Sequence, residues 1–270
     1  MSGVKPPAFV LLESRFKADI DRVASLTRES GSLLLYPLKT FSLASGLIKM
    51  LPWIDGFSTS SLFEAKLARE LAGKKKTIHF TAPGIRREEA TEIFQSIDRI
   101  YFNSQSQMMR LNDLLRDELK VGLRINPQIS FIEDDRYNPS RQSSKLGTPL
   151  KEIAELLSNG LPPLIGRITG ILIHNNTDSV DFLQLYQTIE NLDQNLSKWL
   201  SSLEWINLGG GYLYNEATDL QPFYDAVNLL RNKHGLEVFI EPGAAIVRDA
   251  GYIVSSVLDI FKSDGKTIAI

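Results

Sequence analysis

Short apolar runs recur along the chain, with longer amphipathic stretches between them. A short run bounded by turn-forming residues predicts a buried strand, and apolar residues three or four positions apart predict a helix. We expect strands at 32–38, 53–59, 76–81, 99–103, 120–126, 168–174, 204–209 and 236–241. We expect helices at 60–71, 86–97, 104–115, 179–200 and 222–235.

The alternation of strands and helices predicts an α/β protein with a parallel sheet. Eight such repeats are typical of a (β/α)8, TIM-like barrel. The alternative is an open doubly wound sheet, which usually has fewer strands and a glycine-rich phosphate turn after the first one. The first junction here, "YPLKTFS" from Tyr36 to Ser42, contains no glycine. The barrel is therefore the fold we predict.

Two pieces lie outside the predicted barrel. A short strand at 7–14 precedes a helix at 15–30, and the final segment alternates like a β-hairpin or meander with a turn at "KSDGK". We expect three parts: 1–30, an N-terminal strand and helix associated with the C-terminal β part; 31–245, the barrel; and 246–270, the first strands of a β domain. A two-stranded ribbon is marginal in water by itself, so we expect the rest of that domain to be absent from this sequence.

The amino-acid composition mainly excludes some classes of function and some kinds of site. Apolar residues make up 43% of the 270 residues, and the net charge of −2 comes without a basic block that would favour nucleic acid or a membrane surface. The chain has no cysteine, which excludes disulfides, thiolate metal sites and a cysteine nucleophile. Its three histidines show no metal-ligand spacing. With no signal peptide or membrane span, we predict a cytoplasmic protein.

Polar residues stand at the carboxyl ends of the predicted strands, where the chemistry of such barrels takes place. They include Lys39 after the first strand, Arg124 on the fifth, His174 and Asn176 after the sixth, "NLGGGY" (207–212) after the seventh and Glu241 after the eighth. All of them would converge on one mouth. A long polar loop at 127–148 follows the fifth strand, and such loops are often functional.

Each residue has a plain interpretation beside the functional one. Lys39 could simply reach solvent, the glycine triplet could be a tight turn, and His174 could be an ordinary loop histidine. Glu241 needs a cationic partner if it is buried, and Arg124 could serve. Together, however, an amine, a glycine triplet that can approach an anion, a flat ring and a terminal carboxylate favour a pyridoxal 5'-phosphate (PLP) site.

The chain resembles the alanine-racemase-like, fold-type III PLP decarboxylases, in particular the carboxynorspermidine/carboxyspermidine decarboxylases of polyamine biosynthesis. The matching segments run in the family's order through nearly the whole chain: "LKTFS" (38–42), "FNSQSQ" (102–107), "GLRINP" (122–127), "NPSRQSSKLG" (138–147), "NLGGGY" (207–212), "EPG" (241–243) and "VLDIFKSDGKTIAI" (257–270). "FNSQSQ" and "NPSRQSSKLG" separate this subfamily from ornithine and diaminopimelate decarboxylases.

The resemblance implies a role for each predicted site residue. Lys39 matches the lysine that binds the PLP aldehyde, His174 the histidine that stacks on the ring, and Glu241 the carboxylate at the pyridine nitrogen. Gly209, Gly210 and Gly211 match the phosphate glycines, and Arg124 matches a barrel arginine near the cofactor. We also expect Glu241 and Asn176 to contact the substrate. The implied activity is decarboxylation of carboxynorspermidine or carboxyspermidine, in a homodimer that shares its sites through the C-terminal domain.

The sequence departs from the family's pattern at three positions and at its end. Ala244 stands where the family usually has glutamate, Lys145 replaces an arginine in "SKLG", and "NNTD" (175–178) lacks a cysteine. Arginine and lysine are not equivalent at a bidentate site. The family's remaining C-terminal domain would follow Ile270. The alternatives are therefore a degenerate, non-catalytic PLP barrel, one part of a split enzyme, or a small PLP-homeostasis barrel.

Overall fold

A computed structural model describes residues 3–159 and 165–270. Eight parallel strands form its centre: β2 (Leu33–Pro37), β3 (Gly56–Thr59), β4 (Thr77–Thr81), β5 (Arg99–Phe102), β6 (Lys120–Asn126), β8 (Gly170–Ile173), β9 (Trp205–Asn207) and β10 (Glu237–Ile240). Each pairs with the next strand in this order, and β10 pairs with β2. The sheet is therefore closed, which confirms the predicted barrel and excludes the open doubly wound sheet.

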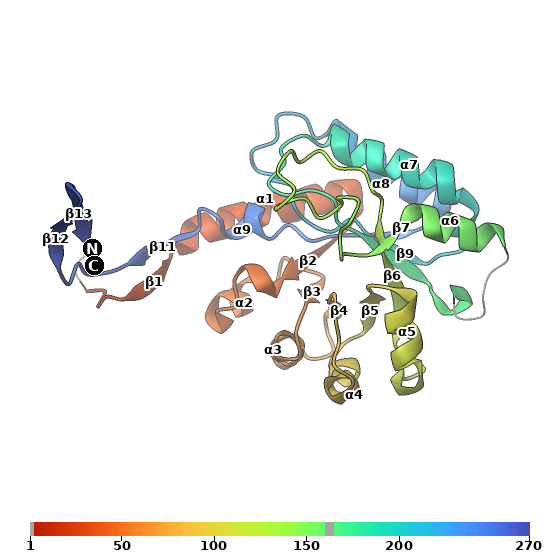
Figure 1. Cartoon of the computed structure of the whole chain (residues 1–270), viewed down its shortest axis with the longest axis horizontal. Helices are drawn as coiled ribbons and strands as arrows, with labels where there is room; N and C mark the ends of the chain where they lie inside the picture. The colour runs from red at the N-terminus through yellow and green to blue at the C-terminus, as the bar shows by residue number, and fades with distance from the viewer. Residues whose placement is uncertain (1–2, 160–164) are drawn as a thin grey trace.

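Helices surround this barrel (Figure 1). They are α1 (Glu13–Ser30), α2 (Ala44–Met50), α3 (Leu62–Ala72), α4 (Arg87–Ser96), α5 (Gln105–Leu111), α6 (Leu150–Ser158), α7 (Leu183–Leu200), α8 (Gln221–Asn228) and the short α9 (Ala244–Val247). The sequence pattern did not predict α2 and α6. The helix predicted at 222–235 is α8 followed by a π-helical turn, Leu229–Lys233. No helix among the described residues is long and apolar enough to cross a membrane.

Two helices begin with the same local signal. The hydroxyl of Ser61 accepts the N–H of Glu64 at the start of α3, and Ser104 accepts the N–H of Gln107 at the start of α5. In return, the Gln107 side chain accepts the N–H of Asn103 at 2.8 Å. The two serine bonds satisfy backbone donors that a helix leaves free at its first turn. They also fix the carboxyl ends of β3 and β5, which immediately precede these helices.

The interior of the barrel is separate from the larger core between the strands and the helices. It holds a small apolar cluster, Leu35, Tyr101, Leu172, Trp205 and Phe239, each at most 2% exposed. Strand residues alternate between the two sides, so neighbours such as Tyr36 pack outside with the helices. At Gly122 and Gly170 a Cβ would overlap the rings of Tyr101 and Trp205, so these two glycines make room for the large interior side chains.

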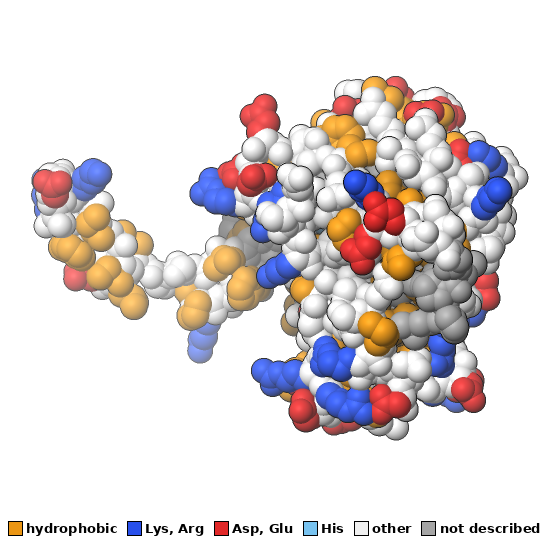
Figure 2. All heavy atoms as spheres, turned by 45° about the vertical axis from the view of Figure 1, so that its right-hand side comes forward, with side chains coloured by type: hydrophobic (Ala, Val, Ile, Leu, Met, Phe, Trp, Pro, Cys, Tyr) orange, Lys and Arg blue, Asp and Glu red, His pale blue; other side chains and the backbone are white. Residues whose placement is uncertain are grey.

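The two chain ends form small antiparallel sheets away from the barrel. β1 (Ala8–Leu11) pairs with β11 (Gly251–Val254), and β12 (Ile260–Ser263) forms a hairpin with β13 (Lys266–Ala269). The hairpin turns in the predicted "KSDGK" segment. We call these four strands, with the residues that join β11 to β12, the terminal arm; it extends from the barrel in Figure 1, and Figure 2 shows hydrophobic side chains along it. Several are exposed, including Phe9 at 81% and Leu258 at 83%.

Candidate functional site

The predicted site residues lie at one end of the barrel because all eight strands run parallel. Lys39 is in a 3-10 turn, Leu38–Thr40, directly after β2, and His174 directly follows β8. Arg124 is on β6, and Glu241 directly follows β10. Lys39 is exposed, whereas Arg124 and Glu241 are 8% and 5% exposed. The mouth of the barrel thus combines an accessible amine with a buried carboxylate and a buried guanidinium.

The imidazole of His174 is held neutral. Burial, and then the positive charges of Lys39 and Arg124, keep the pKa of His174 well below its usual range. Its Nδ1 accepts the backbone N–H of Gly210 at 3.0 Å. A neutral ring that accepts at Nδ1 carries its proton on Nε2. The positive charges of Lys39 and Arg124 thus disfavour protonation of the imidazole. The bond from Gly210 fixes the orientation of the ring.

The glycine triplet connects the ends of three strands. Gly209 has a φ of 66°, and a Cβ there would lie 2.5 Å from the carbonyl oxygen of Ile173 at the end of β8. At Gly210 a Cβ would lie 2.3 Å from the carbonyl oxygen of Glu241. Only glycine fits such close approaches without moving the backbone. The N–H of Gly209 donates to Oδ1 of Asn207 at 2.8 Å. Two of the triplet's three N–H groups are thus already used within the mouth.

Glu241 and Arg124 are buried charges with unused bonding capacity. Oε1 of Glu241 accepts Nδ2 of Asn207 at 2.7 Å, and no other described side chain donates to this carboxylate. Burial lowers the pKa of Arg124 to about 10, an effect that the charge of Glu241 partly offsets. Among the described residues, none accepts a hydrogen bond from the Arg124 guanidinium. Buried polar groups are normally satisfied, so both side chains are suited to bind a polar ligand at the mouth.

Asn176 is 2% exposed at the same rim. Its Nδ2 donates to Oε1 of Gln184 at 2.5 Å, and its Oδ1 accepts the N–H of Thr177 at 2.9 Å. Most of its bonding capacity therefore stabilises the loop after β8. In the acidic part of the 127–148 loop, Asp134 forms an ion pair with Arg136 at 2.6 Å. Both side chains of this pair are substantially exposed, as in a solvated surface loop.

Sequence reasoning missed how the two subfamily segments are joined. Nδ2 of Asn103 donates to the carbonyl oxygen of Lys145 at 2.9 Å, and its Oδ1 accepts the N–H of Gly147 at 2.9 Å. Asn103, from "FNSQSQ", thus holds the end of the "NPSRQSSKLG" loop beside the mouth. Directly after it, β7 (Thr148–Pro149) pairs with the end of β6. The sequence signal that could have indicated this contact is the high content of polar residues in both segments.

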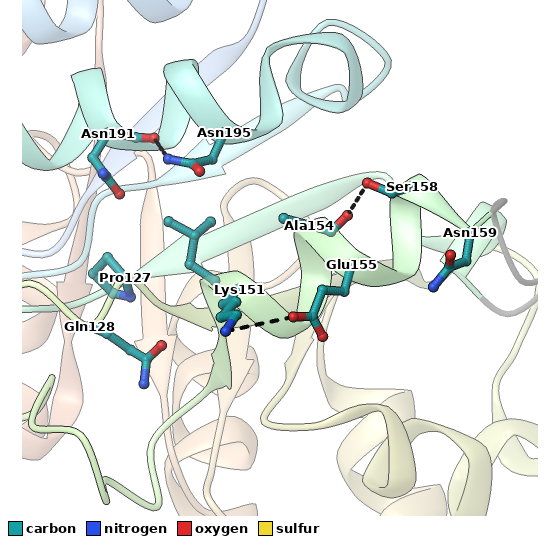
Figure 3. Close-up of a pocket in the computed structure, with 10 residues that line it drawn as sticks. Pro127, Gln128, Lys151, Ala154, Glu155, Ser158, Asn159, Asn191 and Asn195 are labelled. Atoms are coloured by element: carbon teal, nitrogen blue, oxygen red, sulfur yellow. Dashed lines mark hydrogen bonds and ion pairs between the residues drawn. The ribbon is translucent and has the colours of Figure 1, made fainter.

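A surface hollow of about 460 Å³ lies away from the predicted site residues (Figure 3). It lies between α6, α7 and the residues that follow β6, and none of the predicted site residues lines it. Its polar groups largely bond to one another: Lys151 faces Glu155 at 3.9 Å, and Asn195 donates to the carbonyl oxygen of Asn191 at 2.8 Å. We therefore place the candidate site at the mouth. No group of three or more His, Asp or Glu in the described part of the chain could hold a metal ion.

Comparisons with known proteins show which family the chain is similar to. The chain is 33% identical to a carboxyaminopropylagmatine decarboxylase from Synechocystis, across 97% of this chain and 66% of that protein. It is 28% identical to a carboxynorspermidine/carboxyspermidine decarboxylase from Campylobacter jejuni, across 99% and 67%. The crystal structure of a Campylobacter jejuni carboxynorspermidine decarboxylase with norspermidine superimposes with a TM-score of 0.83 at 26% identity, covering 98% of this chain and 67% of that one.

The chain thus spans slightly less than two thirds of the Synechocystis relative, at 66% of its length. Nearly the whole of this chain takes part in these matches, at 97–99% of its length. Residues 19–248 match the family model described as the pyridoxal binding domain of pyridoxal-dependent decarboxylases. The matched range contains the amine, the imidazole, the glycine triplet and the carboxylate that the structure brings to one mouth. The chain belongs to the family of pyridoxal-dependent decarboxylases.

Proposed function

We propose that this chain binds PLP at the barrel mouth and forms the cofactor-binding part of a carboxynorspermidine or carboxyspermidine decarboxylase. The observation that carries the proposal is the meeting of Lys39, His174 and Glu241 at one rim. The residues fit the cofactor on physical grounds: a guanidinium without an acceptor, a half-used carboxylate and a glycine loop suit a planar, anionic heterocycle.

The proposed roles follow from the chemistry of each group. Lys39 supplies the exposed amine that binds the cofactor aldehyde, and His174 supplies a neutral ring that stacks without adding charge. Glu241 holds the proton on the pyridine nitrogen, and the glycine loop, through Gly211, contributes to phosphate binding. Arg124 balances negative charge beside Glu241. Bound PLP supplies the electron sink that accepts the electron pair released when a carboxylate leaves as carbon dioxide.

Cofactor binding is tested by incubation with PLP, borohydride reduction and peptide mass spectrometry. The expected result is a stable adduct on Lys39 that is absent in Lys39→Ala. Lys49→Ala is the matched control, because Lys49 is an exposed lysine on the neighbouring helix α2 that pairs with Glu13 at 2.7 Å. An adduct that persists in Lys39→Ala, or no adduct in the wild type, would refute the cofactor proposal.

Substrate class is supported by the relatives, whose names describe decarboxylases of carboxylated polyamines. The test supplies PLP with carboxynorspermidine, carboxyspermidine, carboxyaminopropylagmatine or diaminopimelate in separate reactions, and mass spectrometry identifies the amine product. Release of norspermidine or spermidine supports the proposal, and preference for another substrate reassigns the specificity. Cofactor binding without any turnover would favour the second candidate, a non-catalytic PLP barrel or one part of a split enzyme. Ala244, at a position where the resemblance leads us to expect glutamate, favours that candidate.

The domain division and the homodimer are part of the same proposal. We assign 31–245 to the PLP-binding barrel, and 1–30 and 246–270 to a part that associates with the C-terminal β region. Support comes from the pairing of β1 with β11, which joins the two ends of the chain. Limited proteolysis should cut within 246–270 before it cuts within 31–245, and light scattering measures whether the chain forms dimers. Early cleavage within 31–245 would overturn the division.

A further inference from the structure

Arg248 connects three loops at the mouth of the barrel. It directly follows α9, in the segment after β10. Its Nη2 lies 2.5 Å from Oδ2 of Asp178 in the loop after β8, and its Nη1 lies 3.7 Å from Oε1 of Glu216 in the loop after β9. These three loops carry His174, the glycine triplet and Glu241. One guanidinium therefore joins the segments that form most of the proposed site.

The loops after β8 and β9 are also joined by backbone bonds beside Gly211. The N–H of Ser179 donates to the carbonyl oxygen of Gly211 at 2.9 Å, and the N–H of Leu213 donates to the carbonyl oxygen of Ser179 at 2.8 Å. A Cβ at Gly211 would lie 2.1 Å from the carbonyl oxygen of Asn176, so the two loops approach as closely as only glycine permits. Among the described residues, none accepts the N–H of Gly211. That donor is therefore available to an anion, at the point where the two loops meet.

Asp178 has a backbone conformation that benefits from an external contact. Its φ is 54°, in the left-handed region that few residues other than glycine adopt, although aspartate tolerates it better than most. The ion pair with Arg248 holds the Asp178 side chain at the end of α9, directly before Ser179 and its backbone bonds. The loop after β9 has a second contact with α9, because Nδ2 of Asn215 donates to the carbonyl oxygen of Ala245 at 2.5 Å. Both loops are therefore fixed to the same short helix and its end.

We propose that Arg248 is a positioning residue, which holds the loops after β8 and β9 together so that the N–H of Gly211 stays in place to bind a phosphate group. The inference rests on the proposed function for the identity of that phosphate, which is the one on PLP. Ala244, at the start of α9, has no polar side chain to offer an anion, so the placement of backbone donors decides how well the anion is bound. Both terminal nitrogens of Arg248 face carboxylates. Arg248 therefore acts through the loops and not as a ligand.

The exposure of the ion pair sets the size of the expected effect. The side chains of Arg248 and Asp178 are 38% and 55% exposed, and solvent weakens an ion pair between exposed side chains. The pair therefore contributes little to the stability of the whole barrel, and its removal should leave the fold intact. We expect its loss to weaken the binding of the phosphate group about three- to fivefold.

The test compares dissociation constants for PLP and for pyridoxal, which has the same ring and aldehyde but no phosphate. The double variant Arg248→Gln with Asp178→Asn removes the ion pair and keeps the net charge of the wild type. Asparagine also tolerates the left-handed backbone at position 178. The double variant should raise the dissociation constant of PLP about three- to fivefold and leave that of pyridoxal unchanged. Equal weakening of both ligands would mean a purely structural role and would overturn the inference.

Single variants distinguish positioning from direct contact with the phosphate. Asp178→Asn alone should weaken PLP binding, because the loop after β8 loses its ion pair. If Arg248 itself bound the phosphate, removal of its carboxylate partner would preserve or strengthen PLP binding, and that result would overturn the inference. Arg15→Gln is the matched control, because Arg15 is an arginine on α1 that is 57% exposed and pairs with Asp249 at 3.4 Å, outside the loops after β8 and β9. It should change neither dissociation constant.

Amide hydrogen exchange of the cofactor-free protein separates this inference from the proposed function. In the double variant the N–H groups of Ser179 and Leu213 should exchange faster than in the wild type, since they form the bonds between the two loops. In Arg15→Gln they should exchange at the wild-type rate. Unchanged exchange in the double variant would refute the inference whatever binds at the mouth. Faster exchange together with no PLP binding by the wild type would overturn the proposed function and the ligand, while the joining of the loops by Arg248 would be upheld.

Discussion

The backbone N–H of Gly210 donates to Nδ1 of His174 across 3.0 Å. A residue without a side chain, from the loop after β9, thereby orients the aromatic ring that follows β8. Backbone groups therefore help to hold the site in place. They lie so close to neighbouring atoms that a Cβ added at Gly209 or Gly210 would overlap them.

Gly210→Ala should lower the free energy of unfolding by about 1–3 kcal/mol, the usual cost of overpacking. The added Cβ would lie 2.3 Å from the carbonyl oxygen of Glu241 and would displace the loop. Urea denaturation measures the loss. Gly84→Ala is the control, because a Cβ at Gly84 meets nothing within 4 Å; it should change stability by less than about 0.5 kcal/mol. Equal effects at the two positions would contradict the prediction.

Stability should fall as the pH is lowered from 7.5 to 5.5. The pKa values of His79 and His174 are held well below the usual range in the folded protein, first by burial. In the unfolded chain these imidazoles take up protons below about pH 6.5. The unfolded state therefore binds more protons, and each histidine contributes a slope of up to about 1.4 kcal/mol per pH unit below that value.

The pH effect is measured as the free energy of unfolding across that range. In His174→Gln the free energy of unfolding should change less steeply with pH. The difference should equal the contribution of one histidine, since glutamine does not titrate. A variant slope identical to that of the wild type would show that the pKa of His174 is not lowered in the folded protein.

Asn103→Ala should loosen the 127–148 loop, because it removes the amide that bonds to Lys145 and Gly147. The expected cost is about 1–3 kcal/mol, with faster proteolysis within 127–148. Mass spectrometry of early cleavage products measures this directly. Asn195→Ala removes an exposed amide that donates to Asn191 within its own helix, and it should leave the cleavage pattern unchanged. Early cleavage elsewhere in Asn103→Ala would contradict the assigned role.

The terminal arm should make the protein associate with itself. It carries exposed apolar residues, including Ile253 at 66% on β11 and Leu258 at 83% between β11 and β12, and open strand edges promote pairing. The double substitution Ile253→Lys and Leu258→Lys should reduce concentration-dependent association seen by light scattering. Phe63→Lys is the control, because Phe63 is 78% exposed on α3 in the barrel. Equal association of all three proteins would place the contact elsewhere.

The order of the elements could be predicted from the sequence because barrel strands are short apolar runs with turns at both ends. The helix α6 was missed because it follows the long loop directly and starts at Leu150 without a side-chain cap. The rim residues could be predicted because parallel strands end together. The hydrogen bond between His79 and Tyr101 inside the barrel could not, since both look like ordinary alternating strand residues until the barrel closes.

The pairing of β1 with β11 joins Leu11 to Gly251 in one ladder. During synthesis the first strand therefore leaves the ribosome long before its partner exists, and the whole barrel has to emerge in between. Closing so long a loop slows the pairing, since loop entropy must be overcome before the contact forms. The first strand must accordingly stay unpaired until every barrel strand has been made, and the sheet of β1 and β11 can form only after β10 has left the ribosome.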